Sequence, residues 1–148
     1  MKAIIADDNE RNVEYLSDIL SKVDGIELVG KAKDGEEELQ LIRELKPDVV
    51  LTDNDMPKYK GIEVIETIKK ELNNDAPIFI MITGDMEKSL INKMIELEVA
   101  SYLRKPIDEK RLIEELESIM RPPEKNVNIT FQKNRKESFI KRILSRFK

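Results

Sequence analysis

Aspartate residues supply most of the side chains in this sequence that could do chemistry. Asp7 and Asp8 form an acidic pair near the N-terminus, and Asp53 begins a second acidic stretch that ends at Asp55. The chain has no His and no Cys, which removes the commonest general base, thiolate nucleophiles and the usual zinc ligands. Any chemistry must therefore rest on carboxylates, hydroxyls and lysines.

Carboxylates that lie close together favour a bound cation. Two like charges about 4 Å apart repel by roughly 4 kcal/mol at an effective dielectric constant of about 20, so a cluster of Asp7, Asp8 and Asp53 would be costly without one. A donor set made only of oxygen is typical of Mg²⁺, Mn²⁺ or Ca²⁺. We therefore predict a Mg²⁺ site that also accepts Mn²⁺. A carboxylate beside such an ion can attack phosphorus directly and form an aspartyl phosphate.

These residues can meet only if the fold brings distant parts of the chain together. Five short apolar runs alternate with longer segments that carry apolar residues at helical spacing. The runs are residues 3–6, 27–30, 49–52, 78–82 and 100–103. Runs that are apolar at consecutive positions are typical of parallel strands covered on both faces. The alternation predicts an α/β fold with five βα units, in which Asp34, Asp85 and Asp108 are expected as helix N-caps.

Polar side chains follow four of the five predicted strands. Asp7 and Asp8 follow the first, Asp53 the third, Thr83 the fourth and Lys105 the fifth. Taken singly, each has a structural explanation as a helix cap or a solvated loop residue. In a doubly wound sheet, however, strands one, three, four and five are neighbours, and ligands bind outside their carboxyl ends. We therefore expect three carboxylates, a hydroxyl and an ammonium to converge at this edge.

The charge of the chain is divided unevenly. The net charge of −4 combines a net +7 over residues 121–148, where nine Lys and Arg face two Glu, with a net −11 over residues 1–120. A Pro-Pro pair at residues 122–123 stands at this shift in composition and marks a predicted boundary. We predict a folded domain over residues 1–121 and a basic C-terminal extension over residues 122–148.

The extension supports three interpretations. Residues 137–148 place apolar and basic side chains at helical spacing, which predicts a basic amphipathic helix. This segment could dock on the acidic domain or on a partner, contact nucleic acid or an anionic membrane surface, or link to a further domain. Basic charge alone supports only non-specific binding, so no specific DNA binding is predicted.

Taken together, the residues at the strand ends resemble the receiver domain of two-component response regulators. The resemblance covers residues 1 to about 120. Its motifs are Asp7-Asp8, Asp53 with Met56-Pro57 and Gly61, Thr83, Tyr102 and Lys105-Pro106. It implies a doubly wound, flavodoxin-like (βα)5 sandwich whose five-stranded parallel sheet has the order 2-1-3-4-5.

The resemblance also implies roles for these residues. Asp53 would accept the phosphoryl group, while Asp8, Asp53 and the backbone carbonyl of Asp55 would bind Mg²⁺ directly. Asp7 would act on the metal through water. Lys105 would pair with the phosphoryl group, next to a cis Lys105-Pro106 bond.

The function implied by this resemblance is a phosphorylation-activated switch. Thr83 would move toward the phosphoryl group and the ring of Tyr102 would turn inward, remodelling the surface of the fourth helix, fifth strand and fifth helix. The expected partners are a sensor histidine kinase or histidine phosphotransfer protein, a downstream protein target, and a second copy of the phosphorylated chain. Such a protein catalyses only its own phosphorylation and dephosphorylation. The sequence shows neither a signal-peptide pattern nor an apolar run of about 18 residues, so we expect a cytoplasmic protein without a membrane span.

Two other interpretations come from different classes of protein. Asp53-Asn54-Asp55 has the spacing of the nucleophile and general acid in Mg²⁺-dependent phosphohydrolases of the haloacid-dehalogenase type, although that resemblance gives no place to Asp7-Asp8 on an earlier strand. A flavodoxin-like binding module shares the architecture. It would need a phosphate-binding loop after the first strand, where the acidic pair would repel a phosphate.

Overall fold

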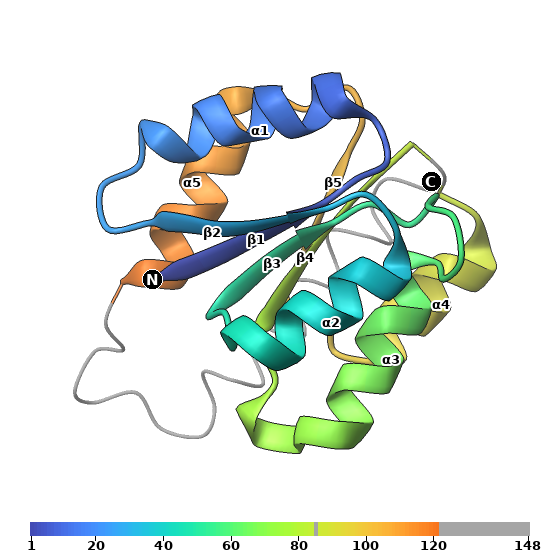
Figure 1. The fold of residues 1–148 in the computed structure, drawn as a ribbon. Coiled ribbons are helices and arrows are strands. Elements are labelled where there is room, and N and C mark those ends of the chain that lie inside the picture. The colour runs from blue at the N-terminus through green and yellow to red at the C-terminus, as the bar shows by residue number, and fades with distance from the viewer. Residues whose placement is uncertain (85, 122–148) are drawn as a thin grey trace, which may run out of the picture.

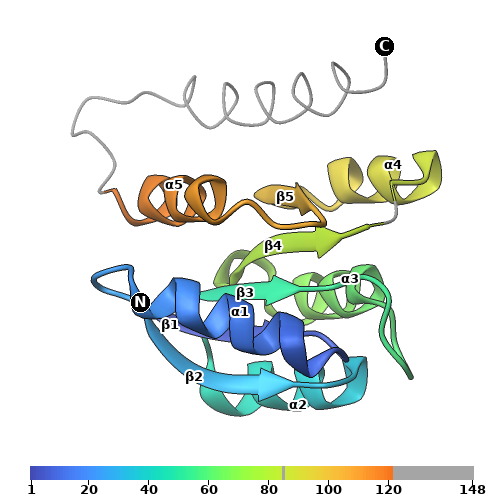
Figure 2. The same ribbon diagram turned by 90° about the horizontal axis from the view of Figure 1, so that it is seen from above.

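Five parallel strands form one sheet, in the order β2-β1-β3-β4-β5, in the computed structural model, which describes residues 1–84 and 86–121 (Figure 2). The strands are β1 (Lys2–Ala6), β2 (Glu27–Ala32), β3 (Val49–Thr52), β4 (Ile78–Thr83) and β5 (Ser101–Arg104). The predicted (βα)5 fold and its strand order are therefore confirmed. β2 extends two residues beyond the predicted run because Lys31 and Ala32 pair with Ile5 and Ala6 of β1.

A helix follows each strand and the helices form two layers. They are α1 (Glu10–Ser21), α2 (Gly35–Leu45), α3 (Gly61–Leu72), α4 (Lys88–Glu96) and α5 (Glu109–Met120), with a short 3₁₀ turn η1 (Asn73–Asp75) after α3. Figure 1 shows α1 and α5 on one face of the sheet and α2, α3 and α4 on the other. Because both faces are covered, the apolar side chains of the central strands are buried whichever way they point.

Two of the three predicted N-caps are confirmed. The side chain of Asp34 accepts a hydrogen bond from the backbone N–H of Glu37, and that of Asp108 accepts one from Arg111. The prediction for Asp85 is wrong, because α4 begins at Lys88 and its N-cap residue is Glu87. Glu87 itself has extended backbone angles, so the first helical turn starts only after it.

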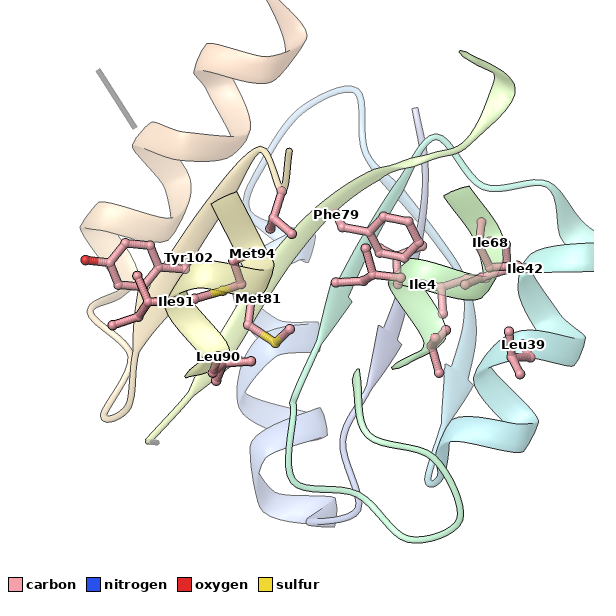
Figure 3. Close-up of a cluster of buried hydrophobic side chains, with 14 residues drawn as sticks. Ile4, Leu39, Ile42, Ile68, Phe79, Met81, Leu90, Ile91, Met94 and Tyr102 are labelled. Carbon is pink, nitrogen blue, oxygen red and sulfur yellow. The ribbon is translucent and has the colours of Figure 1, made fainter. Parts of the chain in front are cut away.

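The core consists of two main apolar clusters, one on each face of the sheet. The cluster under α2, α3 and α4 includes Phe79 of β4 and Tyr102 of β5 (Figure 3). Tyr102 is only 3% exposed and its ring lies beside Ile91 and Met94 of α4. No helix in residues 1–84 and 86–121 has the length and apolar character that crossing a membrane requires.

Gly61 fixes how closely α3 can approach the end of β3. A Cβ atom at this position would lie 2.3 Å from the backbone oxygen of Asp53, which a folded chain cannot accommodate without a shift of the main chain. Gly61→Ala is therefore expected to lower the free energy of unfolding by about 1–3 kcal/mol, as overpacking of a tight contact does. Gly84→Ala is the matched control, since its Cβ would meet nothing within 4 Å. Urea unfolding of both variants tests this, and equal stabilities would contradict it.

Candidate functional site

Side chains from the ends of three strands meet at the carboxyl edge of the sheet. Asp7 directly follows β1, Asp53 directly follows β3, and Lys105 directly follows β5. The ammonium nitrogen of Lys105 lies 3.0 Å from Asp7 Oδ2 and 3.0 Å from Asp53 Oδ2. The ammonium group of Lys105 is thus shared by two carboxylates that are far apart in the sequence.

The backbone places these three residues by carrying the sheet hydrogen bonds one residue past each strand. The N–H of Asp7 donates to the carbonyl of Ala32 at 3.0 Å, and the N–H of Asp53 donates to that of Ala6 at 2.9 Å. The N–H of Lys105 donates to the carbonyl of Thr83 at 3.0 Å. The Lys105-Pro106 peptide bond is cis, as the resemblance implied.

Further hydrogen bonds orient the two buried carboxylates. Asp7 Oδ1 accepts from the backbone N–H of Asn9 at 2.9 Å, and Asp7 Oδ2 accepts from the side-chain amide of Asn12 at 3.2 Å. Asp53 Oδ1 accepts from the backbone N–H of Asp55 at 3.2 Å. Each carboxylate therefore has a hydrogen-bond partner on both oxygens, which fixes its orientation.

The acidic cluster fits a hard divalent cation. Carboxylate oxygens of Asp7, Asp8 and Asp53 lie within 4.8 Å of one another. Asp7 and Asp53 are 2% and 4% exposed, whereas Asp8 is exposed and keeps one side of the cluster open to water. Mg²⁺ commonly binds through one or two carboxylates and keeps several waters, which matches this combination of buried and exposed oxygens.

The electrostatics of the cluster leave an excess of negative charge. Burial raises the pKa of Asp53, and the charge of Asp7 acts in the same direction, while the contact with Lys105 lowers it by less. Burial would lower the pKa of Lys105, but its hydrogen bonds to Asp53 and Asp7 outweigh this and raise it, so the ammonium is charged at neutral pH. One ammonium faces three carboxyl groups, and a divalent cation would balance the remainder.

The other predicted site residues lie around this centre. Thr83 ends β4 and is fully buried, whereas the side chain of Asp55 is exposed and its backbone N–H donates to Asp53 Oδ1. Tyr102 was expected to turn inward on phosphorylation, but its ring is already buried in this structure. Any change at Tyr102 therefore starts from a ring that is packed against α4.

Two buried polar residues next to Asp53 were missed from the sequence. Asn54 is 4% exposed; its carbonyl accepts from the N–H of Gly61 and its side-chain oxygen from the N–H of Ile62. Glu38 of α2 is fully buried and contacts Thr52. A signal for Glu38 was present, because it lies four residues before Ile42 and shares the inward face of its helix.

The sequence matches known receiver domains over most of its length. Residues 3–117 match the family model described as the response regulator receiver domain. An uncharacterized response regulatory protein from Vibrio cholerae is 31% identical over 126 residues, which are 85% of this chain and 51% of the relative. This chain therefore spans about half the length of that curated relative.

Solved structures with the same fold include two that share more than a quarter of their sequence with this chain. The N-terminal domain of an uncharacterized protein from Wolinella succinogenes is 38% identical, with a TM-score of 0.73 over 80% of this chain and 92% of that domain. The response regulatory domain of protein mrkE from Klebsiella pneumoniae is 28% identical, with a TM-score of 0.72 over 80% of this chain and 93% of that domain.

Proposed function

This chain belongs to the response regulator receiver domain family, and from this premise we propose that it is a phosphorylation-activated switch with Asp53 as its phosphoacceptor. The family consists of signalling switches of two-component systems rather than conventional enzymes. Because the chain belongs to this family, we no longer consider the phosphohydrolase and the flavodoxin-like binding module as its function. The observation that carries the proposal is the position of Asp53 Oδ2, which lies 3.0 Å from the ammonium of Lys105 and within the acidic cluster.

The proposed metal is Mg²⁺, with Mn²⁺ as a substitute. Asp8, Asp53 and the backbone carbonyl of Asp55 would bind it directly and Asp7 through water. When bound, the ion would neutralise charge on the phosphoryl oxygens during transfer. The support for this assignment is the donor set, since three carboxylates offer one oxygen each within 4.8 Å of one another and a divalent cation would offset their mutual repulsion.

The proposed transfer needs only one nucleophile from the chain. An Asp53 carboxylate oxygen attacks the phosphorus of a phosphohistidine, so that an O–P bond forms while the N–P bond breaks. The donor imidazole leaves with the electron pair of that bond and takes up a proton from water. The ammonium of Lys105 lies close enough to Asp53 to pair with the negative charge that develops on the phosphoryl oxygens. The hydroxyl of Thr83, at the end of the neighbouring strand β4, would donate a hydrogen bond to a phosphoryl oxygen.

The proposed consequence is a change in the surface of α4, β5 and α5. Thr83 and Tyr102 are the proposed switch residues, because one ends β4 and the other packs against α4. A sensor histidine kinase or histidine phosphotransfer protein is the proposed donor, in the cytoplasm, and a downstream protein or a second phosphorylated copy is the proposed target. We keep residues 1–121 as the receiver unit. The predictions made for residues 122–148 lie outside the residues that the structure describes.

Chemical phosphorylation tests the proposed function without any partner protein. Incubation with acetyl phosphate and Mg²⁺ should give a single phosphoryl adduct in the intact mass of the wild type. Asp53→Asn should give none, and chelation of the metal with EDTA should abolish the adduct in the wild type. Asp55→Asn is the matched control, since it keeps the backbone carbonyl and N–H of residue 55 and should still form the adduct. Absence of an adduct in the wild type would contradict the proposal.

A further inference from the structure

A carboxyl group is buried directly behind the phosphoacceptor. Glu38 of α2 is 0% exposed, and its Oε2 lies 3.1 Å from Oγ1 of Thr52, the last residue of β3. Its Oε1 has no hydrogen-bond partner among the residues that the structure describes. A buried carboxylate that keeps its charge needs a cation or several donors, and residues 1–84 and 86–121 offer Glu38 only the hydroxyl of Thr52.

The hydroxyl of Thr52 has two acceptors but only one proton. Besides Glu38 Oε2, Thr52 Oγ1 lies 3.2 Å from the backbone carbonyl oxygen of Asp53. An ionised Glu38 can only accept, so the two contacts would compete for the same proton. If Glu38 is protonated, its O–H donates to Thr52 Oγ1 and the Thr52 hydroxyl donates to the Asp53 carbonyl. Both contacts are then satisfied at once.

We propose that Glu38 carries a proton in the folded protein and is a positioning residue for phosphoryl transfer, acting through Thr52 on the main chain of Asp53. This inference rests on the proposed function of Asp53. Glu38 touches neither the phosphoryl group nor the metal site. Its role is to hold the peptide group that carries the nucleophile.

The packing around the Asp53 carbonyl shows why its position matters. Gly61 approaches this oxygen so closely that a Cβ would lie 2.3 Å from it, and the next carbonyl, of Asn54, accepts from the N–H of Gly61. The peptide after Asp53 is therefore clamped between α2 and the start of α3. A shift of this peptide would turn the Asp53 side chain relative to Lys105, and reaction rates are sensitive to displacements of this size.

The charge of Glu38 matters for the same site. The cluster of Asp7, Asp8 and Asp53 is already short of positive charge, and an ionised Glu38 would add a fourth carboxylate behind it. Burial is the main reason that the pKa of Glu38 rises, to about 8, with the hydrogen bond from Thr52 opposing this and the charge of Asp53 adding to it. The hydrogen-bond geometry and the electrostatics therefore favour the same protonated form.

Rates of phosphorylation in matched variants test the positioning role. With acetyl phosphate and Mg²⁺ at pH 7, Glu38→Met should slow formation of the adduct on the order of tenfold, because Met fills the space but donates no hydrogen bond. Glu38→Gln should restore the wild-type rate to within about twofold, because its amide N–H can donate to Thr52. Thr52→Val should form the adduct as slowly as Glu38→Met, whereas Thr52→Ser should keep the wild-type rate because it retains the hydroxyl. The Glu38→Met/Thr52→Val double variant should be no slower than either single variant.

A spectroscopic measurement reports the proton independently of the reaction. In protein labelled with ¹³C at the Glu side-chain carboxyl groups, the signal that disappears in Glu38→Gln should have the chemical shift of a protonated acid at pH 7. A chemical shift typical of an ionised carboxylate would overturn the inference. So would a Glu38→Met variant that forms the adduct at the wild-type rate, or a Glu38→Gln variant that forms it as slowly as Glu38→Met. These outcomes differ from failure of the proposed function, in which the wild type itself forms no adduct and the positioning role falls with it.

Discussion

Asp53→Asn is expected to make the protein more stable than the wild type in metal-free buffer and less stable than the wild type in Mg²⁺. Because burial raises the pKa of Asp53 above its ordinary value of 3.8, ionisation of this carboxyl opposes folding at neutral pH. The neutral amide removes that cost and leaves Lys105 paired with Asp7 alone. We therefore expect Asp53→Asn to have a higher free energy of unfolding than the wild type without metal.

Magnesium should reverse this order. A ligand that binds only the folded state stabilises it by about 2.7 kcal/mol at 100 times its dissociation constant, and the wild type should gain this amount. Asp53→Asn loses a charged ligand from the cluster and should gain little. Urea unfolding at pH 7 in EDTA and in saturating MgCl₂ measures both effects. Asp55→Asn, whose exposed side chain lies outside the cluster, should respond to Mg²⁺ as the wild type does.

Equal stabilisation of Asp53→Asn and the wild type by Mg²⁺ would show that Asp53 is not a metal ligand. A loss of stability in metal-free Asp53→Asn would show that the ion pair with Lys105 outweighs the cost of burying the charge. Both results concern the same carboxylate that the proposed reaction uses. The site would thus hold a destabilising charge whose relief comes from the metal that function requires.

The fold and the centre of the site could be predicted from the sequence because one physical rule governs both. Strands buried on two faces appear as continuous apolar runs, and the first polar residue after each run lies at the sheet edge. Asp7 and Asp53 each follow such a run directly, whereas Lys105 stands two residues after the run that ends at Leu103. The structure joins all three through the ammonium of Lys105. The apolar runs alone do not determine the order of the strands in the sheet, and that order was predicted from the family resemblance.

Other features depend on packing that local patterns do not encode. The predicted end of β2 was too early because Lys31 interrupts the apolar run, although an edge strand tolerates a charged side chain on its exposed positions. The burial of Tyr102 depends on where α4 lies over the sheet. Glu38 was overlooked because a glutamate on a helix is ordinarily exposed, and only its helical spacing from Ile42 places it on the buried face.

Glu38 should make the stability of the protein fall as the pH rises from about 5 to 8. In the unfolded chain this carboxyl ionises near its ordinary value of 4.5, whereas in the folded protein burial keeps its proton to about pH 8. Since the folded pKa lies above the unfolded one, its contribution to stability is complete below pH 4.5 and is lost as the pH rises toward 8. The loss is about 1.4 kcal/mol per pH unit, or roughly 5 kcal/mol over the whole interval.

Glu38→Gln isolates this contribution because an amide does not titrate. In metal-free buffer, urea unfolding between pH 5 and 8 should show a much steeper decline for the wild type than for Glu38→Gln. Asp53, whose pKa is also raised, adds a decline of the same sign to both proteins and so largely cancels in the difference. Glu44→Gln on the exposed side of the same helix controls for loss of a carboxyl and should keep the wild-type slope. Parallel curves for the wild type and Glu38→Gln would mean that Glu38 is already ionised in the folded protein, and Thr52 would then have to divide one proton between two acceptors.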